Sequence, residues 1–173
     1  MAGRAKLRRP VVVGAFEGWN DAADAATAVI DHIASSYPTD LIFELDSDDY
    51  YDYQMVRPQV VNGDDGREIV WPTTSVSVSH LPGRDVVLLK GPEPNLHWQR
   101  FCTSLVSAFR SLEPELVILL GAMLTDSPHS RPLPVTAASG DKALARALGL
   151  ESSSYEGPTG ITGVLGDACR RAG

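Results

Sequence analysis

The feature that most constrains the fold is a set of short, nearly continuous apolar runs separated by helical patterns. The first run, Pro10 to Ala15, fits a strand that is covered on both faces. Later runs at Asp40 to Leu45, Asp85 to Lys90 and Glu115 to Leu120 are predicted to be strands of the same sheet. Because these strands alternate with helices, we expect an α/β fold with a mostly parallel central sheet.

The connections between these strands have the apolar spacing of helices. Residues 22–33 place their apolar side chains on one face of a 3.6-residue repeat, and Asn20 or Asp21 can cap this helix. Further helices are expected at 95–112, 142–148 and 162–171.

The middle of the chain has a different character. Residues 59–62 and 67–71 flank a Gly-Asp-Asp-Gly sequence, which predicts a β-hairpin with a short loop. Two more strands are expected at 74–80 and 134–138. With 173 residues the chain is long enough for one domain, so we treat 1–173 as a single α/β domain. Its last helical pattern stops without a following strand, so we expect the natural protein to continue.

The composition argues against several kinds of partner. A net charge of -7 disfavours nucleic acid, whose phosphates are neutralised by Lys and Arg. The basic residues at 4–9 precede an apolar run that is shorter than the core of a secretory signal, and Glu17 follows it closely. No run approaches the ~18 apolar residues of a membrane span. We therefore expect a cytoplasmic protein that binds neither nucleic acid nor a membrane.

Polar loops follow three glycines, Gly14, Gly91 and Gly121, that we predict to end core strands. In open α/β sheets, ligands bind outside the carboxyl ends of the strands. Parallel strands would therefore bring eight polar side chains together as a candidate ligand or partner site: Glu17, Asn20, Asp21, Glu93, Asn95, Asp126, His129 and Arg131. The alternative remains open that these residues serve as helix caps, complement helix dipoles or stabilise turns.

Known phosphate and nucleophile motifs are missing. Glu17, Asp21 and Asp24 crowd the amino end of the first helix and would repel an anion there. The sequence has no Walker lysine motif, GxGxxG loop or GxSxG elbow. Cys102 and Cys169 lack metal-ligand spacing and are interpreted as buried small hydrophobes. We therefore predict no cofactor, no metal site and no specified catalytic residue.

An acidic and aromatic segment, residues 44–54, stands out between the first two predicted structural units. Tyrosine offers a large amphipathic area at low entropy cost and is favoured at protein interfaces. The segment is therefore a candidate interface, and a solvated acidic loop is the alternative. The candidate interface residues are Asp49, Tyr50, Tyr51, Asp52 and Tyr53.

Five strings of the sequence resemble the proteasome assembly chaperone 2 family in its actinobacterial form. They are Gly14 to Ala22, Asp49 to Asp52, Gly91 to Asn95 with Trp98, Pro128 to Pro132, and Tyr155 to Gly160. The resemblance implies a three-layer α/β/α fold, similar to that of nucleoside phosphorylases and peptidyl hydrolases. It also implies homo-oligomers, with a trimer as one possibility, and a non-enzymatic role in assembling or binding proteasome particles.

One departure concerns the tail. Family members that dock on proteasomes use a carboxyl-terminal hydrophobic-Tyr-X sequence for docking. In this chain Ala172 occupies the position of that tyrosine. Docking through such a tail would require chain beyond Gly173.

Two functional hypotheses follow. The first is an oligomeric, chaperone-like binding protein whose acidic-aromatic surface engages partner subunits. Proteasome subunits are the candidate partners. The second is a hydrolase or phosphorylase-like enzyme that uses Glu17, Asp21, Glu93 or His129 as acid and base on a small molecule such as a nucleoside. Similarity of fold keeps the second hypothesis open, but fold does not carry function.

Overall fold

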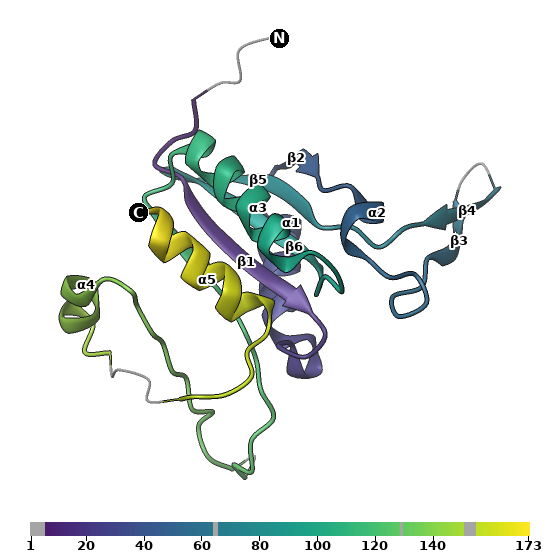
Figure 1. The fold of residues 1–173 in the computed structure, drawn as a ribbon. Helices are drawn as coiled ribbons and strands as arrows, with labels where there is room; N and C mark the ends of the chain where they lie inside the picture. The colour runs from purple at the N-terminus through teal and green to yellow at the C-terminus, as the bar shows by residue number, and fades with distance from the viewer. Residues whose placement is uncertain (1–5, 64–65, 129, 151–154) are drawn as a thin grey trace.

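The computed structural model describes residues 6–63, 66–128, 130–150 and 155–173 (Figure 1). The helices and strands are β1 (Val11–Glu17), a 3₁₀ turn (Ala22–Asp24), α1 (Ala25–Ser36), β2 (Thr39–Glu44), α2 (Ser47–Tyr50), β3 (Gln59–Gly63), β4 (Gly66–Val70), β5 (Ser75–Leu81), β6 (Arg84–Pro92), α3 (Trp98–Leu112), β7 (Leu116–Leu119), α4 (Lys142–Ala147) and α5 (Ile161–Ala172).

The main sheet has five strands in the order β2-β5-β6-β1-β7. Strand β1 pairs in parallel with both β6 and β7, whereas β5 is antiparallel to both β2 and β6. Four strands therefore run in one direction and β5 alone is reversed. The expected mostly parallel sheet is confirmed, and the carboxyl ends of β1, β2 and β6 lie at one edge.

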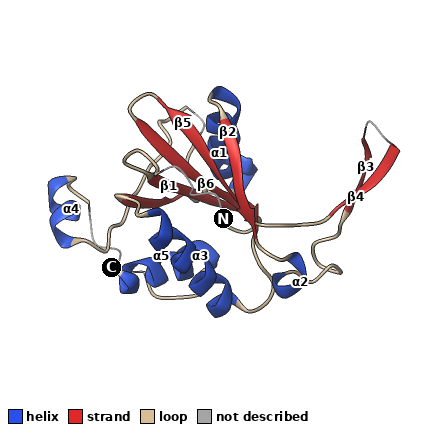
Figure 2. Ribbon diagram, turned by 90° about the horizontal axis from the view of Figure 1, so that it is seen from above, coloured by secondary structure: helices blue, strands red, loops and turns tan. Residues whose placement is uncertain are grey.

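Helices cover both faces of this sheet and give three layers. Figure 2 shows α1 on one face and α3 with α5 on the other. On the α3 and α5 face, Val12 and Phe16 of the sheet share a buried cluster with Phe101 and Leu165. On the α1 face, Ala15 and Leu88 share a cluster with Ile30. The predicted α/β sandwich is confirmed, and its core lies on both sides of β1 and β6.

Strands β3 and β4 form a separate two-stranded sheet that projects from the body (Figures 1 and 2). Their antiparallel register runs from Gln59↔Val70 to Gly63↔Gly66, which confirms the predicted hairpin. Gly66 has a φ of 121°, a backbone conformation that favours glycine.

The strand predicted at 134–138 is wrong. This segment takes part in no sheet of the described residues, and Leu133 and Val135 are 78% and 91% exposed. Pro132 and Pro134 lack the N–H groups that a strand donates, which disfavours a ladder here. Within the described ranges, no helix is long and apolar enough to cross a membrane.

Candidate functional site

Two glycines that we predicted to end strands lie inside them. A Cβ on Gly14 would lie 3.0 Å from Leu89 Cδ2, and one on Gly91 would lie 2.7 Å from the Cα of Thr74. Close packing therefore explains both glycines, and the strands continue beyond them. Strand β1 extends to Glu17, which stands opposite the last residue of β6 in the parallel register.

The carboxyl edge of β1 and β6 contains an open hollow with a volume of about 710 Å³. Three predicted site residues line it, namely Glu17, Glu93 and Asn95. Asp52 and Trp98 also belong to its wall, and no Lys, Arg or His is among its lining residues in the described chain. The hollow is therefore acidic, as the sequence led us to expect for this edge, and it disfavours anions.

Glu93 holds helix α5 in place. Its Oε1 accepts the N–H of Ile161, the first residue of α5, at 2.8 Å. The same oxygen lies 3.5 Å from Asn20 Nδ2, and a Cβ on Gly160 would lie 2.1 Å from that amide nitrogen. A carboxylate at a helix amino end satisfies a free donor and complements the helix dipole. Glu93 thus joins β6 to α5, and Asn20 packs against the joint.

Asp21 has a comparable structural role in α1. Its side chain is buried, and Oδ1 accepts the N–H groups of Ala26 at 2.6 Å and Thr27 at 3.3 Å. The Thr27 hydroxyl donates to its other oxygen. The expectation that Asn20 or Asp21 caps this helix therefore fits Asp21. Helix α1 begins at Ala25 because Ala23 and Asp24 have left-handed backbones.

The remaining predicted site residues do not line the hollow. Asp126 and Arg131 are exposed on the segment that follows β7. The backbone N–H of Arg131 donates to the carbonyl of Pro128 at 3.0 Å, which forms a local turn. His129 lies outside the described residues. The structure thus brings together the residues that follow β1 and β6 and leaves Asp126 and Arg131 apart from them.

Tyr50 and Tyr51 lie in the core and do not form a surface. The Tyr50 ring meets Phe101 edge to face, with ring centres 5.2 Å apart. The Tyr51 hydroxyl lies 2.6 Å from the Thr74 hydroxyl and donates to the Pro92 carbonyl at 3.0 Å. Burial raises the pKa of Tyr51 to about 12. Tyr50 is the last residue of helix α2 and Tyr51 follows it with an extended backbone, and both side chains are buried.

The other candidate interface residues remain partly accessible and anchor the segment. Asp49 forms an ion pair with Arg100 of α3 at 2.9 Å. The N–H of Asp52 donates to Asn95 Oδ1 at 3.0 Å, so Asn95 fixes the wall of the hollow. Tyr53 donates to Asp48, and this hydrogen bond is the main reason that its pKa is raised to about 12.

A compact polar cluster lies at the opposite end of the sheet, where the parallel strands begin. Asp85 is buried and accepts the backbone N–H and the guanidinium of Arg8, both at 2.7 Å. Nδ1 of His80 lies 3.0 Å from Asp85, and its Nε2 lies 3.3 Å from Asp40. The hydrogen bond from Arg8 is the main cause that holds the pKa of Asp85 far below its usual range. The bond with Asp85 raises the pKa of His80.

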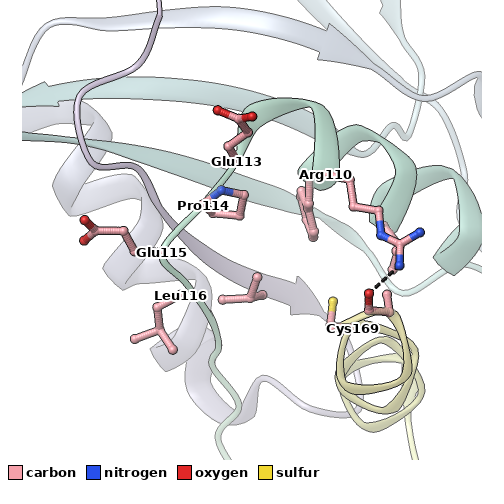
Figure 3. A pocket seen from close by; sticks show the side chains of 11 residues that line it. Arg110, Glu113, Pro114, Glu115, Leu116 and Cys169 are labelled. Atoms are coloured by element: carbon pink, nitrogen blue, oxygen red, sulfur yellow. Dashed lines mark hydrogen bonds between the residues drawn. The ribbon is translucent and has the colours of Figure 1, made fainter.

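A second hollow, of about 410 Å³, is mainly apolar and lies between α3, β7 and α5 (Figure 3). Val106, Phe109 and Cys169 line it, and the Arg110 guanidinium donates to the carbonyl of Ala172 at its rim. Burial raises the pKa of the Cys169 thiol, and that of Cys102 to about 11. Both thiols therefore stay protonated near neutral pH and behave as the small hydrophobes that the sequence indicated.

The arrangement is suited to binding more than to proton transfer. Two of its carboxylates, Glu93 and Asp21, already accept helix N–H groups. Within the described part of the chain, no group of three His, Cys, Asp or Glu side chains is placed to hold a metal ion. The side chains that sequence reasoning missed are Asp52 and Trp98 as wall residues of the hollow. The density of Asp and Tyr around position 52 was the available signal.

Fold and hollow together define an α/β sandwich protein with an acidic depression at the carboxyl edge of its parallel strands. A family model described as the PAC2 family matches residues 15–173. The chain therefore belongs to the PAC2 family.

Solved structures support this assignment. A PAC2 family protein from Streptomyces avermitilis is 47% identical, with a TM-score of 0.91 over 94% of this chain and 71% of that chain. A proteasome-assembly chaperone homologue from Mycobacterium tuberculosis is also 47% identical, with a TM-score of 0.85 over 94% of this chain and 70% of that one.

A more distant solved structure shares the fold. A Pyrococcus furiosus protein called an archaeal homolog of proteasome-assembly chaperone has 15% identity and a TM-score of 0.59, over 97% of this chain and 69% of that chain. At this identity the likeness concerns the fold alone. The comparison with curated proteins finds no match.

Proposed function

We propose that this protein is a non-enzymatic, chaperone-like binding protein that acts in the cytoplasm in proteasome assembly or related proteasome interactions. Membership of the PAC2 family and the 47% identity to a proteasome-assembly chaperone homologue support the proposal. In this proposal the partners are proteasome subunits and further copies of the chain, with trimers among the assemblies.

The observation that carries the proposal is the acidic hollow. Glu17 and Asp52 face it without a basic neighbour among the lining residues, so their negative charge is available to a partner. The hollow is open, and Trp19, which follows its lining residue Gly18 in the chain, is 64% accessible. A protruding basic segment of a protein partner would fit both the charge and the openness.

The catalytic alternative has less support from the same geometry. Acid-base catalysis needs a free acid and a free base within reach of the substrate. Glu93 and Asp21, two of its four candidates, are engaged by α5 and α1. Glu17 is the other candidate that lines the hollow, and His129 lies outside the described residues.

The direct test is binding of the full chain to purified proteasome subunits of the same organism. We expect the double variant Glu17→Arg with Asp52→Arg to weaken binding at least 10-fold, because like charges would then face a basic partner. Glu113→Arg is the matched control, since Glu113 is exposed at the opposite edge. Equal binding by the double variant and the wild type would contradict the role of the hollow, and no binding by any form would contradict the proposal.

A parallel assay addresses catalysis. The purified chain is incubated with nucleosides and inorganic phosphate, and release of free base is followed over time. We expect no release above the buffer rate. Release that disappears in the Glu17→Gln variant would overturn the non-enzymatic assignment.

A further inference from the structure

A third hollow opens at the end of the main sheet where the parallel strands begin. Its volume is about 560 Å³, and small-molecule sites occupy roughly 300–1,000 Å³. The segment 6–10, strands β2 and β5, and the carboxyl end of α3 surround it. It shares no lining residue with the acidic hollow in the described chain, so the two are separate.

The floor of this third hollow is apolar and continuous with the core. Val78 of β5 lines it and is 6% exposed. Leu7, Ile42 and Leu112 also line it and pack against the buried cluster between the sheet and α3. Because burial of apolar surface is favourable, a ligand with an apolar body gains free energy by covering this floor.

Two carboxylates stand at the mouth of the hollow. The side chains of Asp40 and Glu113 line it and are 79% and 74% exposed. One oxygen of Asp40 lies 3.3 Å from Nε2 of His80, and its other oxygen accepts no hydrogen bond from the described residues. Glu113 lies 3.7 Å from the ammonium of Lys6, which is longer than a hydrogen bond. Both carboxylates therefore keep acceptor capacity for a ligand.

The end of helix α3 adds to the negative potential at the mouth. The helix ends at Leu112, and Glu113 follows it with a left-handed φ of 51°. The last carbonyls of a helix lack donors within the helix and carry a partial negative charge, which favours a cation. Ser111 and Leu112 of this last turn line the hollow. The helix end and the two carboxylates thus favour the same sign of charge.

The basic groups nearby leave room for a further cation. The guanidinium of Arg8 donates to Asp85 and to the carbonyl of Leu81, and Arg8 is not among the lining residues that the structure describes. Lys6 does line the hollow, but its side chain is 88% exposed and its pair with Glu113 contributes little. Lys6 is itself an alkyl stem that ends in an ammonium, so the chain carries an example of a group that this mouth accepts.

We propose that this hollow binds a small amphipathic cation, a molecule with an apolar body and a single primary ammonium group. The apolar body covers the floor, and the ammonium reaches Asp40 or Glu113 in place of Lys6. Charge complementarity selects this ligand, because an anion would face two carboxylates and the end of α3, and a neutral molecule would leave the carboxylates unpaired. The inference goes beyond the proposed function, since it concerns a different site and a different class of ligand.

The experiment measures the binding of matched probes to the full chain by isothermal titration calorimetry at pH 7. Phenylbutylamine, phenylbutanol and phenylbutyrate share one apolar body and differ in the charge of the head group. We expect the amine to bind at least 10-fold more tightly than the alcohol, and the carboxylate to bind more weakly than the alcohol. Ethylamine keeps the ammonium and loses most of the apolar body, so it should bind at least 10-fold more weakly than phenylbutylamine.

Variants test the mouth and the floor separately. Asp40→Asn with Glu113→Gln removes both charges at nearly constant size, so it should weaken the amine at least 10-fold and leave the alcohol within 2-fold. Ser111→Phe places a ring at the mouth and should weaken both probes at least 10-fold. Ser107→Phe is the matched control, because Ser107 is exposed on the same helix and does not line the hollow. Circular dichroism and urea denaturation identify any variant that fails to fold.

The outcomes either support the inference or overturn it. A wild type that binds none of the probes, or binds the amine and the carboxylate equally, overturns it. Amine binding that the folded Asp40→Asn and Glu113→Gln double variant retains also overturns it, as does amine binding that is lost in Glu17→Arg with Asp52→Arg, because the cation then lies in the acidic hollow. None of these results depends on whether proteasome subunits bind, so each proposal can fail without the other.

Discussion

The amino and carboxyl ends of the parallel strands, here called the amino edge and the carboxyl edge of the main sheet, differ in how their charged side chains are paired. At the amino edge every acid in the polar cluster faces a base, and the pairs there are Arg8 with Asp85, His80 with Asp40 and Asp85, and Arg9 and Arg84 with Glu115. At the carboxyl edge, Glu17, Asp52 and Glu93 line a hollow that has no basic lining residue. Paired charges stabilise a fold, whereas a collection of like charges costs stability and is retained where a partner supplies the opposite sign.

The largest effect is expected at the paired edge. Asp85→Ala should lower the free energy of unfolding by about 3 kcal/mol, because it removes a buried acceptor that Arg8 and His80 share. Urea denaturation at pH 7 measures this change. Glu113→Ala is the control, since Glu113 and Lys6 form an exposed pair at 3.7 Å that contributes little. A loss under about 1 kcal/mol in Asp85→Ala would contradict the role of the cluster.

The carboxyl edge should lose less when its structural carboxylate is removed. Glu93→Ala leaves the N–H of Ile161 without its acceptor and should cost about 1 kcal/mol, the usual range for a helix cap. Glu93→Gln keeps an acceptor oxygen and should lose less than half as much. Both values come from urea denaturation at pH 7. Equal losses for the two variants would show that the charge, and not the hydrogen bond, holds α5.

The sequence predicted the elements whose pattern is local. The apolar run of β1 and the 3.6-residue repeat of α3 each depend on neighbours in the chain, and both elements form where expected. The hairpin of β3 and β4 was predictable from its turn residues for the same reason. Segment 134–138 shows the limit, because a strand also needs a partner strand that is distant in sequence, and local composition does not supply that information.

The roles of single polar residues were harder to predict because their partners are distant in sequence. Glu93 meets Ile161 across 68 residues, so nothing near Glu93 indicates a helix anchor. Tyr51 is covered by Thr74 and Pro92, and its local composition indicated a surface instead. The acidic hollow was predictable in outline, since the ends of parallel strands meet at one edge, but its wall residue Trp98 was not.

A smaller effect at the paired edge depends on pH. The folded pKa of His80 is raised above its unfolded value, so its stabilisation is fully present below about pH 6.5 and is lost as the pH rises through the folded pKa. The pKa of Asp85 is lowered, so its contribution is present above its unfolded pKa and is lost only in strong acid. His80→Asn should therefore flatten the decline in stability above about pH 6.5, by less than about 1 kcal/mol because the ring is more than a third exposed.

Urea denaturation of wild type and His80→Asn between pH 5 and 9 tests this sign. The charged groups that face the ring are Asp40 on β2 and Asp85 on β6, with Arg8 bound to the latter. The Asp40→Asn variant serves as control, since it removes the more exposed partner and should reproduce part of the flattening. A wild type whose stability rises with pH across this range would contradict the assignment.

The smallest effect on stability, and the sharpest contrast between the edges, is expected at Glu17. Glu17→Gln should leave the free energy of unfolding within about 0.5 kcal/mol of the wild type, with any change in the stabilising direction, because it removes one charge from an acidic hollow. Glu115→Gln is its counterpart at the amino edge and should destabilise, since Glu115 pairs with Arg9 and Arg84 at 3.0 and 2.9 Å. Salt should shrink both differences by screening. If Glu17→Gln destabilises as much as Glu115→Gln, the carboxyl edge is held by its charges as the amino edge is, and the hollow loses its distinguishing property.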